Sequence, residues 1–250
     1  MSSAEQLERQ VLQFCRQVLQ FTAQEKILIA CSGGTDSMAL AELLQRISSH
    51  EPGWQLAICH VHHGLRGTAA DHDADQVAQY AAERQIPFFL RRVAAGQYAQ
   101  SEGLSIEDAA RRLRYQALEE VRHLSGCTLI ATGHHKEDQA ETVLMRLLRG
   151  AGPTGLAGIL PRRAAIVRPL LFLRRHELTA YCQERQLTVC EDESNADTAF
   201  LRNRIRHVLL PQLAADYNPE LVETLAKTAL LCRREDAFLE SLLEPFLSQV

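Results

Sequence analysis

The chain has 250 residues, 46% of them hydrophobic, and a formal net charge of −4 at pH 7. These values are ordinary for a globular protein and allow one large α/β domain with a helical appendage. No apolar run approaches the ~18 residues needed to span a membrane, and the seven cysteines include no Cys-x-x-Cys pair. We therefore expect a cytoplasmic protein with reduced thiols, and neither a disulfide framework nor a zinc site.

The first predicted element is an amphipathic helix within residues 1–24. Its inward side chains are expected to be Leu7, Val11, Phe14, Val18 and Phe21. The segment lacks the basic-then-apolar pattern of a secretion signal.

A glycine loop follows the first predicted strand, at residues 27–31, and precedes a predicted helix that starts at Met38. The loop sequence is Ser32-Gly33-Gly34-Thr35-Asp36-Ser37. Glycines let a ligand approach the backbone closely, and a helix N-terminus presents N–H groups together with the positive end of the helix dipole. The pattern predicts an anion site. The alternative is an ordinary strand–turn–helix corner, capped by Asp36 and Ser37.

The loop does not match the two commonest nucleotide motifs. It lacks the lysine of a Walker A loop, and the Gly-x-Gly-x-x-Gly pattern of a dinucleotide fold is absent. Asp36 would repel phosphates unless a cation lay between them, and Mg²⁺ commonly binds one or two carboxylates together with phosphate oxygens. We therefore expect a magnesium-bound polyphosphate at this loop.

Strands and helices alternate along the rest of the chain. The spacing predicts strands over 54–61, 86–93 and 128–132, and helices over 71–85, 105–123 and 136–149. Such alternation predicts an α/β fold in which a parallel twisted sheet has helices on both faces. We expect residues 1–212 to form the catalytic domain, residues 150–161 to be a loop or hinge, and residues 213–250 to be a smaller helical region.

A second polar centre follows the strand at 128–132, where ligand sites of parallel sheets lie. Asp138 and Glu141 stand three positions apart and share a face of the helix at 136–149. Together they can hold a magnesium ion or a substrate ammonium. The alternative is that both acids only stabilise the helix N-terminus through its dipole. His134 is expected to donate a hydrogen bond to a phosphate or a developing oxyanion.

Arginines supply the remaining candidates. Arg111 and Arg114 share a helix face, as do Arg202 and Arg206, and either pair can bind phosphate or only face solvent. Residues 141–210 hold 11 Lys and Arg against 7 Asp and Glu. We expect this basic block to bind nucleic acid through Arg162, Arg163, Arg174 and Arg175, with a solvated surface as the alternative. The acidic stretch 191–195 is expected to cap the helix that follows it.

Several motifs in this order resemble one family. The glycine loop resembles the pyrophosphate loop of N-type ATP pyrophosphatases, and the ensemble resembles tRNA(Ile)-lysidine synthetases. The motifs are the glycine loop at 32–37, His-x-His-His-Gly-Leu-Arg at 60–66, Gly-His-His-Lys-Glu-Asp-Gln-Ala-Glu-Thr at 133–142, Leu-Arg-Gly-Ala-Gly at 148–152, Arg-Pro-Leu-Leu at 168–171 and Asn-Arg-Ile-Arg-His at 203–207.

The resemblance implies an adenine nucleotide alpha hydrolase-like fold and a ligase. That family uses ATP to adenylate the C2 carbonyl of the wobble cytidine in a CAU-anticodon tRNA(Ile), and the ε-amine of L-lysine then displaces AMP. The loop at 32–37 would hold ATP, and Asp36 and Asp138 would bind Mg²⁺. Glu141 would be a catalytic acid on the lysine side of the site or a structural acid. Further catalytic or phosphate contacts would come from Arg114, His134 and either Arg204 or Arg206, with Arg206 the first choice.

Other functions stay open at this point. One is a different tRNA-modifying enzyme with the same loop, such as a thiolase, although paired cysteines are missing. Another is a non-catalytic nucleotide or RNA-binding module. Many members of the resembled family continue into further C-terminal domains, so the chain is expected to be either a short member or a fragment. A homodimer is compatible with the sequence, and no membrane association is expected.

Overall fold

The structure is a computed structural model that describes residues 2–65, 67–190 and 201–247, with side chains described up to 243. It divides into two compact units. The first comprises residues 1–133, 161–170 and 176–191, and the second comprises residues 134–160, 171–175 and 192–250. The domain boundary predicted at residue 212 stays a prediction. The acidic stretch predicted to act as a helix cap, 191–195, lies outside the described residues.

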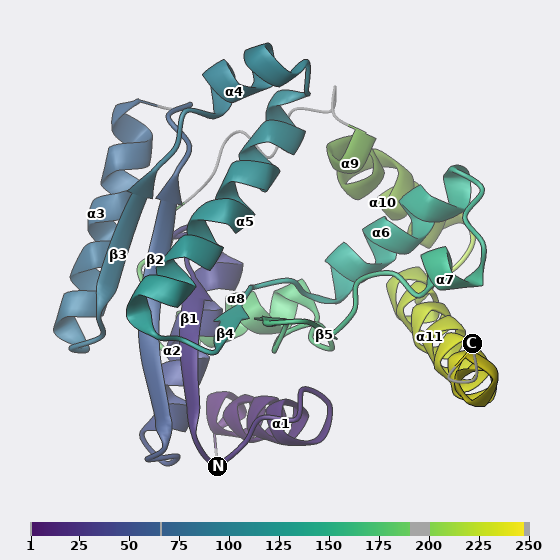
Figure 1. The fold of residues 1–250 in the computed structure, drawn as a ribbon, viewed down its shortest axis with the longest axis horizontal. Coiled ribbons are helices and arrows are strands. Elements are labelled where there is room, and N and C mark those ends of the chain that lie inside the picture. The colour runs from purple at the N-terminus through teal and green to yellow at the C-terminus, as the bar shows by residue number, and fades with distance from the viewer. Residues whose placement is uncertain (1, 66, 191–200, 248–250) are drawn as a thin grey trace. The chain divides into compact units, whose positions relative to one another are not determined.

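The first unit contains one six-stranded sheet in the order β3-β2-β1-β4-β6-β5 (Figure 1). Every pairing is parallel except the one between β5 and β6. The strands are β1 (Glu25–Ala30), β2 (Trp54–His62), β3 (Phe88–Arg92), β4 (Leu129–Ala131), β5 (Arg162–Arg163) and β6 (Ile166–Val167). The predicted α/β class is confirmed, and the three strands whose ends carry polar motifs lie side by side as β2, β1 and β4.

Helices cover both faces of this sheet. The helices that pack on the strands are α2 (Thr35–Ser48), α3 (Thr68–Glu83) and α5 (Ile106–Ser125). Of the other helices, α1 (Ser3–Gln17) packs on α2, and α4 (Ala95–Glu102) packs on α5. Helix α8 (Arg175–Glu184) belongs to the first unit except for its first residue, Arg175. Figure 1 shows α3 and α5 on opposite sides of the sheet. Leu118 and Val121 of α5 pack on Leu28 and Ile130 of the strands. This packing explains why the strands read as continuous apolar runs.

The N-terminal helix is shorter than predicted. It begins with a capping box between Ser2 and Glu5 and ends at Gln17, after which Gln20 takes a left-handed φ of 56°. Because the helical period is broken there, the predicted inward residue Val18 is 43% exposed and Leu19 is buried in its place. Leu7, Val11 and Phe21 are buried as predicted.

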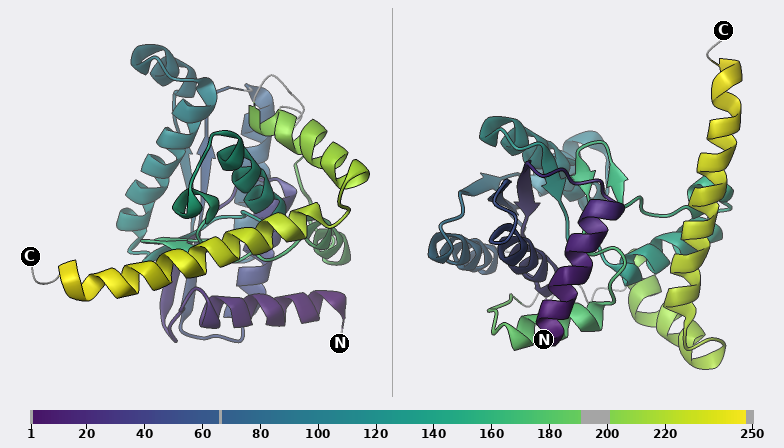
Figure 2. Two further views of the ribbon diagram at one scale, coloured as in Figure 1. Left: turned by 90° about the vertical axis from the view of Figure 1, so that its right-hand side faces the viewer. Right: turned by 90° about the horizontal axis from the view of Figure 1, so that it is seen from below.

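The second unit is helical in its described residues. It consists of α6 (Lys136–Leu148), α7 (Pro153–Leu156), α9 (Leu201–Arg204), the π-helical turn η2 (Ile205–Leu209), α10 (Leu210–Asp216) and α11 (Leu221–Leu247). Figure 2 shows α11 as one continuous helix at the C-terminal end of the chain. The segment predicted as a loop at 150–161 contains the short helix α7, which begins at Pro153. In the parts of the chain that the structure describes, no helix has both the length and the apolarity to cross a membrane.

Candidate functional site

The glycine loop connects β1 to α2 and is held by its own hydroxyl groups. Gly33 has a φ of 93°, a left-handed conformation that favours glycine, and Gly34 is the N-cap of α2. The Ser37 hydroxyl donates to the carbonyl oxygen of Gly34 at 2.9 Å and accepts from the backbone N–H of Ser32 at 3.1 Å. A helix N-terminus fixed in this way presents N–H groups that lack intrahelical partners, which suits an anion.

Two neighbouring segments of the first unit press on the loop. The backbone N–H of Cys190 donates to the carbonyl oxygen of Gly33 at 2.9 Å, and a Cβ added at Gly33 would lie 2.8 Å from Cys190 Sγ. On the other side, a Cβ added at Gly133 would lie 3.0 Å from the carbonyl oxygen of Asp36. Gly133 therefore lets the end of β4 approach the first turn of α2. Cys190 was not predicted as a site residue, since nothing in the local sequence marks it.

Asp36 stands in the first turn of α2 and is half-buried. Its carboxylate acts on Cys182, whose thiol pKa rises to about 12, chiefly through burial and further through the charges of Asp36 and Glu42. Asp36 thus supplies a carboxylate beside an anion site. Among the described residues no three His, Cys, Asp or Glu side chains gather as a metal site. A magnesium ion here would depend on ligand phosphate oxygens together with Asp36.

Arg114 lies on α5, in the first unit. The guanidinium groups of Arg111 and Arg114 lie 5.3 and 5.4 Å from the centre of the Tyr115 ring. Arg168, which follows β6, also acts electrostatically on Tyr115. Burial would raise the pKa of Tyr115, but the charges of Arg114, Arg111 and Arg168 outweigh it and lower the pKa. The structure thus joins Arg111 and Arg114 in one basic cluster and does not choose between them.

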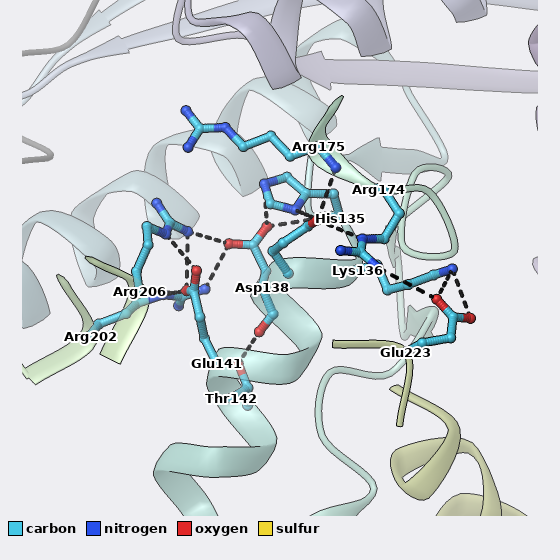
Figure 3. Close-up of polar contacts among 11 residues, drawn as sticks. His135, Lys136, Asp138, Glu141, Thr142, Arg174, Arg175, Arg202, Arg206 and Glu223 are labelled. Carbon is cyan, nitrogen blue, oxygen red and sulfur yellow. Dashed lines mark hydrogen bonds and ion pairs between the residues drawn. The ribbon is translucent and has the colours of Figure 1, made fainter. Parts of the chain in front are cut away.

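The second centre is built on the first two turns of α6, in the second unit. Asp138 accepts the backbone N–H of His135 at 2.9 Å, an N-cap contact that fixes the start of the helix. Asp138 and Glu141 are buried, as expected for inward positions of one helix face, with Glu141 only 1% exposed. Figure 3 shows both carboxylates pointing toward Arg202 and Arg206.

The two arginines bridge the two acids. Arg202 donates to Glu141 at 2.9 Å and to Asp138 at 3.0 Å. Arg206 donates to Glu141 at 2.5 Å and to Asp138 at 2.8 Å. Burial would raise the pKa of Asp138, but the charges of His135, His134, Arg202 and Arg206 hold it below its usual range. Both acids of this cluster are therefore held by paired, charge-assisted hydrogen bonds.

The histidines and the remaining arginines of this region take separate roles. His134 is half-buried and acts electrostatically on Asp138. His135 is buried and contacts Glu137, which also accepts from Arg174 at 2.9 Å. Burial would raise the pKa of Glu137, but these hydrogen bonds and the backbone N–H of Arg175 lower it to about 2. Arg174 is thus held by an acid, and its predicted contact with nucleic acid stays a prediction.

Of the predicted site residues, the structure joins Asp138, Glu141 and Arg206 in the second unit and the whole loop 32–37 in the first. Arg206, and not the exposed Arg204, contacts the acids. Asp36 and Asp138 belong to different units, and their shared magnesium role stays a prediction. Arg202 was not predicted as a site residue, although it stands four residues before Arg206 and the two acids stand three residues apart, and both spacings place side chains on one helix face.

Comparisons with known proteins agree on one family. The PP-loop domain model matches residues 3–213. The chain is 45% identical over 219 residues to the tRNA(Ile)-lysidine synthase of Solibacter usitatus, covering 87% of this chain and 48% of that protein. It is 44% identical over 229 residues to the synthase of Geobacter sulfurreducens, covering 91% and 48%. The chain therefore spans about half the length of the curated relatives it matches.

A solved structure supports the fold. The U34-tRNA thiolase NcsA from Methanococcus maripaludis, with its [4Fe-4S] cluster, superposes with a TM-score of 0.76 at 17% identity, covering 92% of this chain and 80% of that one. At this identity the likeness concerns the fold alone. The family model covers most of the chain and includes the glycine loop. The chain belongs to the PP-loop domain family.

Proposed function

We propose that the chain carries out the ATP-dependent step of tRNA(Ile)-lysidine synthesis. ATP would adenylate the C2 carbonyl of the wobble cytidine in a CAU-anticodon tRNA(Ile), and the ε-amine of L-lysine would then displace AMP. The observation that carries the proposal is the 45% identity to a tRNA(Ile)-lysidine synthase over 87% of the chain. The likeness to the thiolase concerns the fold and adds no second candidate.

The glycine loop is the proposed ATP site. Its glycines and the start of α2 favour the triphosphate and, after transfer, the pyrophosphate anion. Ser32, Thr35 and Ser37 add hydroxyl groups, and Arg111 or Arg114 would neutralise phosphate charge. Binding the departing pyrophosphate in this way favours transfer of AMP to the cytidine oxygen.

Asp36 is the residue best placed to hold Mg²⁺, which would neutralise phosphate charge when bound. The half-buried carboxylate beside an anion site fits this cation, whose other ligands would be phosphate oxygens and waters. Asp138 fits less directly, because its Oδ1 already accepts from two guanidinium groups and its Oδ2 from His135. Asp138 would have to exchange one of these partners before it could bind a metal.

Asp138 and Glu141 are the proposed partners of the lysine ε-ammonium. The amine is cationic in water and has to lose a proton before it attacks the adenylated carbon. Buried acids can hold the ammonium close to the reaction, and His134 would donate to phosphate oxygen. Because the substrates are tRNA, ATP and lysine, we also propose a cytoplasmic location. A homodimer stays a prediction.

The test is incubation of the chain with ATP, L-lysine and total tRNA, followed by mass analysis of the nucleosides. We expect lysidine, with release of AMP and pyrophosphate. With ATP labelled at the α-phosphate and no lysine, label should appear on tRNA, and added lysine should release it as AMP. Label on lysine, as an aminoacyl adenylate, would contradict the mechanism.

A further inference from the structure

The acid pair of the second unit is already occupied by cations of the same chain. Asp138 and Glu141 carry two negative charges, and the guanidinium groups of Arg202 and Arg206 carry two positive charges (Figure 3). A third cation that entered without displacing one of these would leave a net positive charge in a buried site. That arrangement is unfavourable at low local dielectric. A substrate ammonium must therefore replace one arginine.

The two arginines are not equivalent in their contacts. Arg206 donates to both oxygens of Glu141 and to Oδ1 of Asp138. Arg202 donates to Oε2 of Glu141 and to Oδ1 of Asp138, and Arg206 also contacts both of these oxygens. Loss of Arg202 would leave every carboxylate oxygen with a donor. Loss of Arg206 would leave Oε1 of Glu141 without the one donor it has among the described residues, and an unsatisfied buried oxygen is costly.

The backbone supports of the two arginines also differ. Arg206 lies in η2 next to Ile205, which is 1% exposed and packs with Ala140 and Leu144 of α6. Arg202 lies on the four-residue helix α9, which has no buried residue. The two arginine side chains are equally exposed, at 24% for Arg202 and 23% for Arg206, so the difference lies in the backbone support: Leu201 of α9 is only partly buried against the cluster that contains Ile205. Arg202 can therefore swing toward solvent, while the packing of Ile205 holds Arg206 beside the acids.

We propose that Arg202 is a displaceable counter-ion, and that the ammonium group of the amine substrate takes its place between Asp138 and Glu141. Arg206 is the positioning residue that keeps both carboxylates aligned during the exchange. This inference rests on the proposed function for the identity of the amine, L-lysine. It adds that Arg202 competes with the substrate and thereby limits the affinity of the site for it.

The test is the binding of L-lysine to the full chain by isothermal titration calorimetry. Arg202→Gln should bind lysine about tenfold more tightly than the unmodified chain, because a competing pair of charge-assisted hydrogen bonds is removed. Arg206→Gln should weaken lysine binding. Arg234→Gln, an equal charge change on the exposed face of α11, should leave binding unchanged. Nε-acetyl-lysine keeps the α-ammonium group but lacks the ε-ammonium group, so it should bind each of these proteins more weakly than lysine does.

A second variant covers the case in which Arg202→Gln does not fold. Arg202→Lys keeps a cation at the site but cannot form the two-pronged contact, so its lysine affinity should lie between those of the unmodified chain and Arg202→Gln. The melting temperature with and without lysine reports folding and binding together. A folded Arg202→Gln protein that binds lysine no more tightly than the unmodified chain would overturn the inference, as would tighter binding by Arg206→Gln alone.

Nucleoside analysis separates this inference from the proposed function. Lysidine formation without tighter binding by Arg202→Gln would refute the role of Arg202 and leave the proposed function intact. Absence of lysidine, together with no lysine binding by any variant, would refute the proposed function and this inference with it. Lysidine formation with tighter binding by Arg202→Gln supports both.

Discussion

Gly133 is the position where one added carbon should disturb the glycine loop most directly. An alanine Cβ there would lie 3.0 Å from the carbonyl oxygen of Asp36, 3.1 Å from its carbonyl carbon and 3.3 Å from the backbone nitrogen of Ser37. All three are backbone atoms in the first turn of α2, so a side-chain rotation cannot relieve the contact. Either the end of β4 or the start of α2 must move.

The expected cost follows from these distances. Overpacking of this kind typically destabilises a protein by about 1–3 kcal/mol. Replacing glycine where its φ suits other residues returns about 0.4–1 kcal/mol through the unfolded chain. We therefore expect Gly133→Ala to lower the free energy of unfolding by about 1–2 kcal/mol. A shift of a few tenths of an ångström in the loop should also slow ATP cleavage by about tenfold, since a 1 Å misplacement can cost about a hundredfold.

The matched control is Gly96→Ala. Gly96 lies in α4 of the same unit, and an added Cβ there meets nothing within 4 Å. It should be neutral or stabilising by up to about 1 kcal/mol. Urea unfolding measures the free energy of unfolding, and the rate of pyrophosphate release from ATP reports whether the loop keeps its geometry. If Gly133→Ala is as stable and as active as Gly96→Ala, the close approach of β4 to the loop does not constrain it.

Three further predictions concern separate features of the chain. Asp36→Asn should abolish pyrophosphate release at ordinary magnesium while leaving the circular dichroism spectrum unchanged, and near-normal release would remove Asp36 from the proposed metal site. Alkylation of the native chain at pH 8 should modify Cys190 and Cys232, the two half-buried cysteines, and not the five buried ones. ATP should protect Cys190 alone, because its sulfur lies against Gly33; equal protection of Cys232 would argue against contact with the loop. Arg163→Ala should lower the salt dependence of tRNA binding by about one unit of slope, as one phosphate contact is lost. Arg174→Ala should change this slope less, because Glu137 already binds the Arg174 guanidinium in the unmodified chain. If Arg163→Ala has the same salt slope as the unmodified chain, the basic block is a solvated surface.

The elements next to the glycine loop could be predicted from the sequence because local patterns and sheet geometry agree there. A buried apolar strand, two glycines and an amphipathic helix each indicate the same corner, and β1 and α2 form it. The antiparallel pair β5–β6 was not predicted. Its turn at Ala164 has a left-handed φ of 50° without the glycine or asparagine that usually marks such a turn. The early end of α1 after Gln17 likewise depends on contacts that periodicity does not encode.

The sequence predicted the two acids of the candidate site but not their arginine partners, for a physical reason. Asp138 and Glu141 could be placed on one face of α6 because both lie in one helix. Their pairing with Arg202 joins positions more than 60 residues apart, and no local pattern specifies that contact. The same holds for Cys190 and Gly33, which meet only once the chain has folded.

Under the proposed function, the two centres would select ligands of opposite charge by different means. The loop offers backbone N–H groups and a helix dipole, which attract an anion without introducing a full positive charge. The Asp36 carboxylate would repel phosphate unless a cation lay between them, so under the proposed function the loop would favour phosphate ligands that carry magnesium. The acid pair offers two full negative charges, which would be too costly to bury uncompensated, and Arg202 and Arg206 satisfy them before any ligand arrives. Because the acids are buried, the cation site contains arginines that compete with its ligand. The anion site needs no such counter-ion, because its positive potential comes from backbone dipoles.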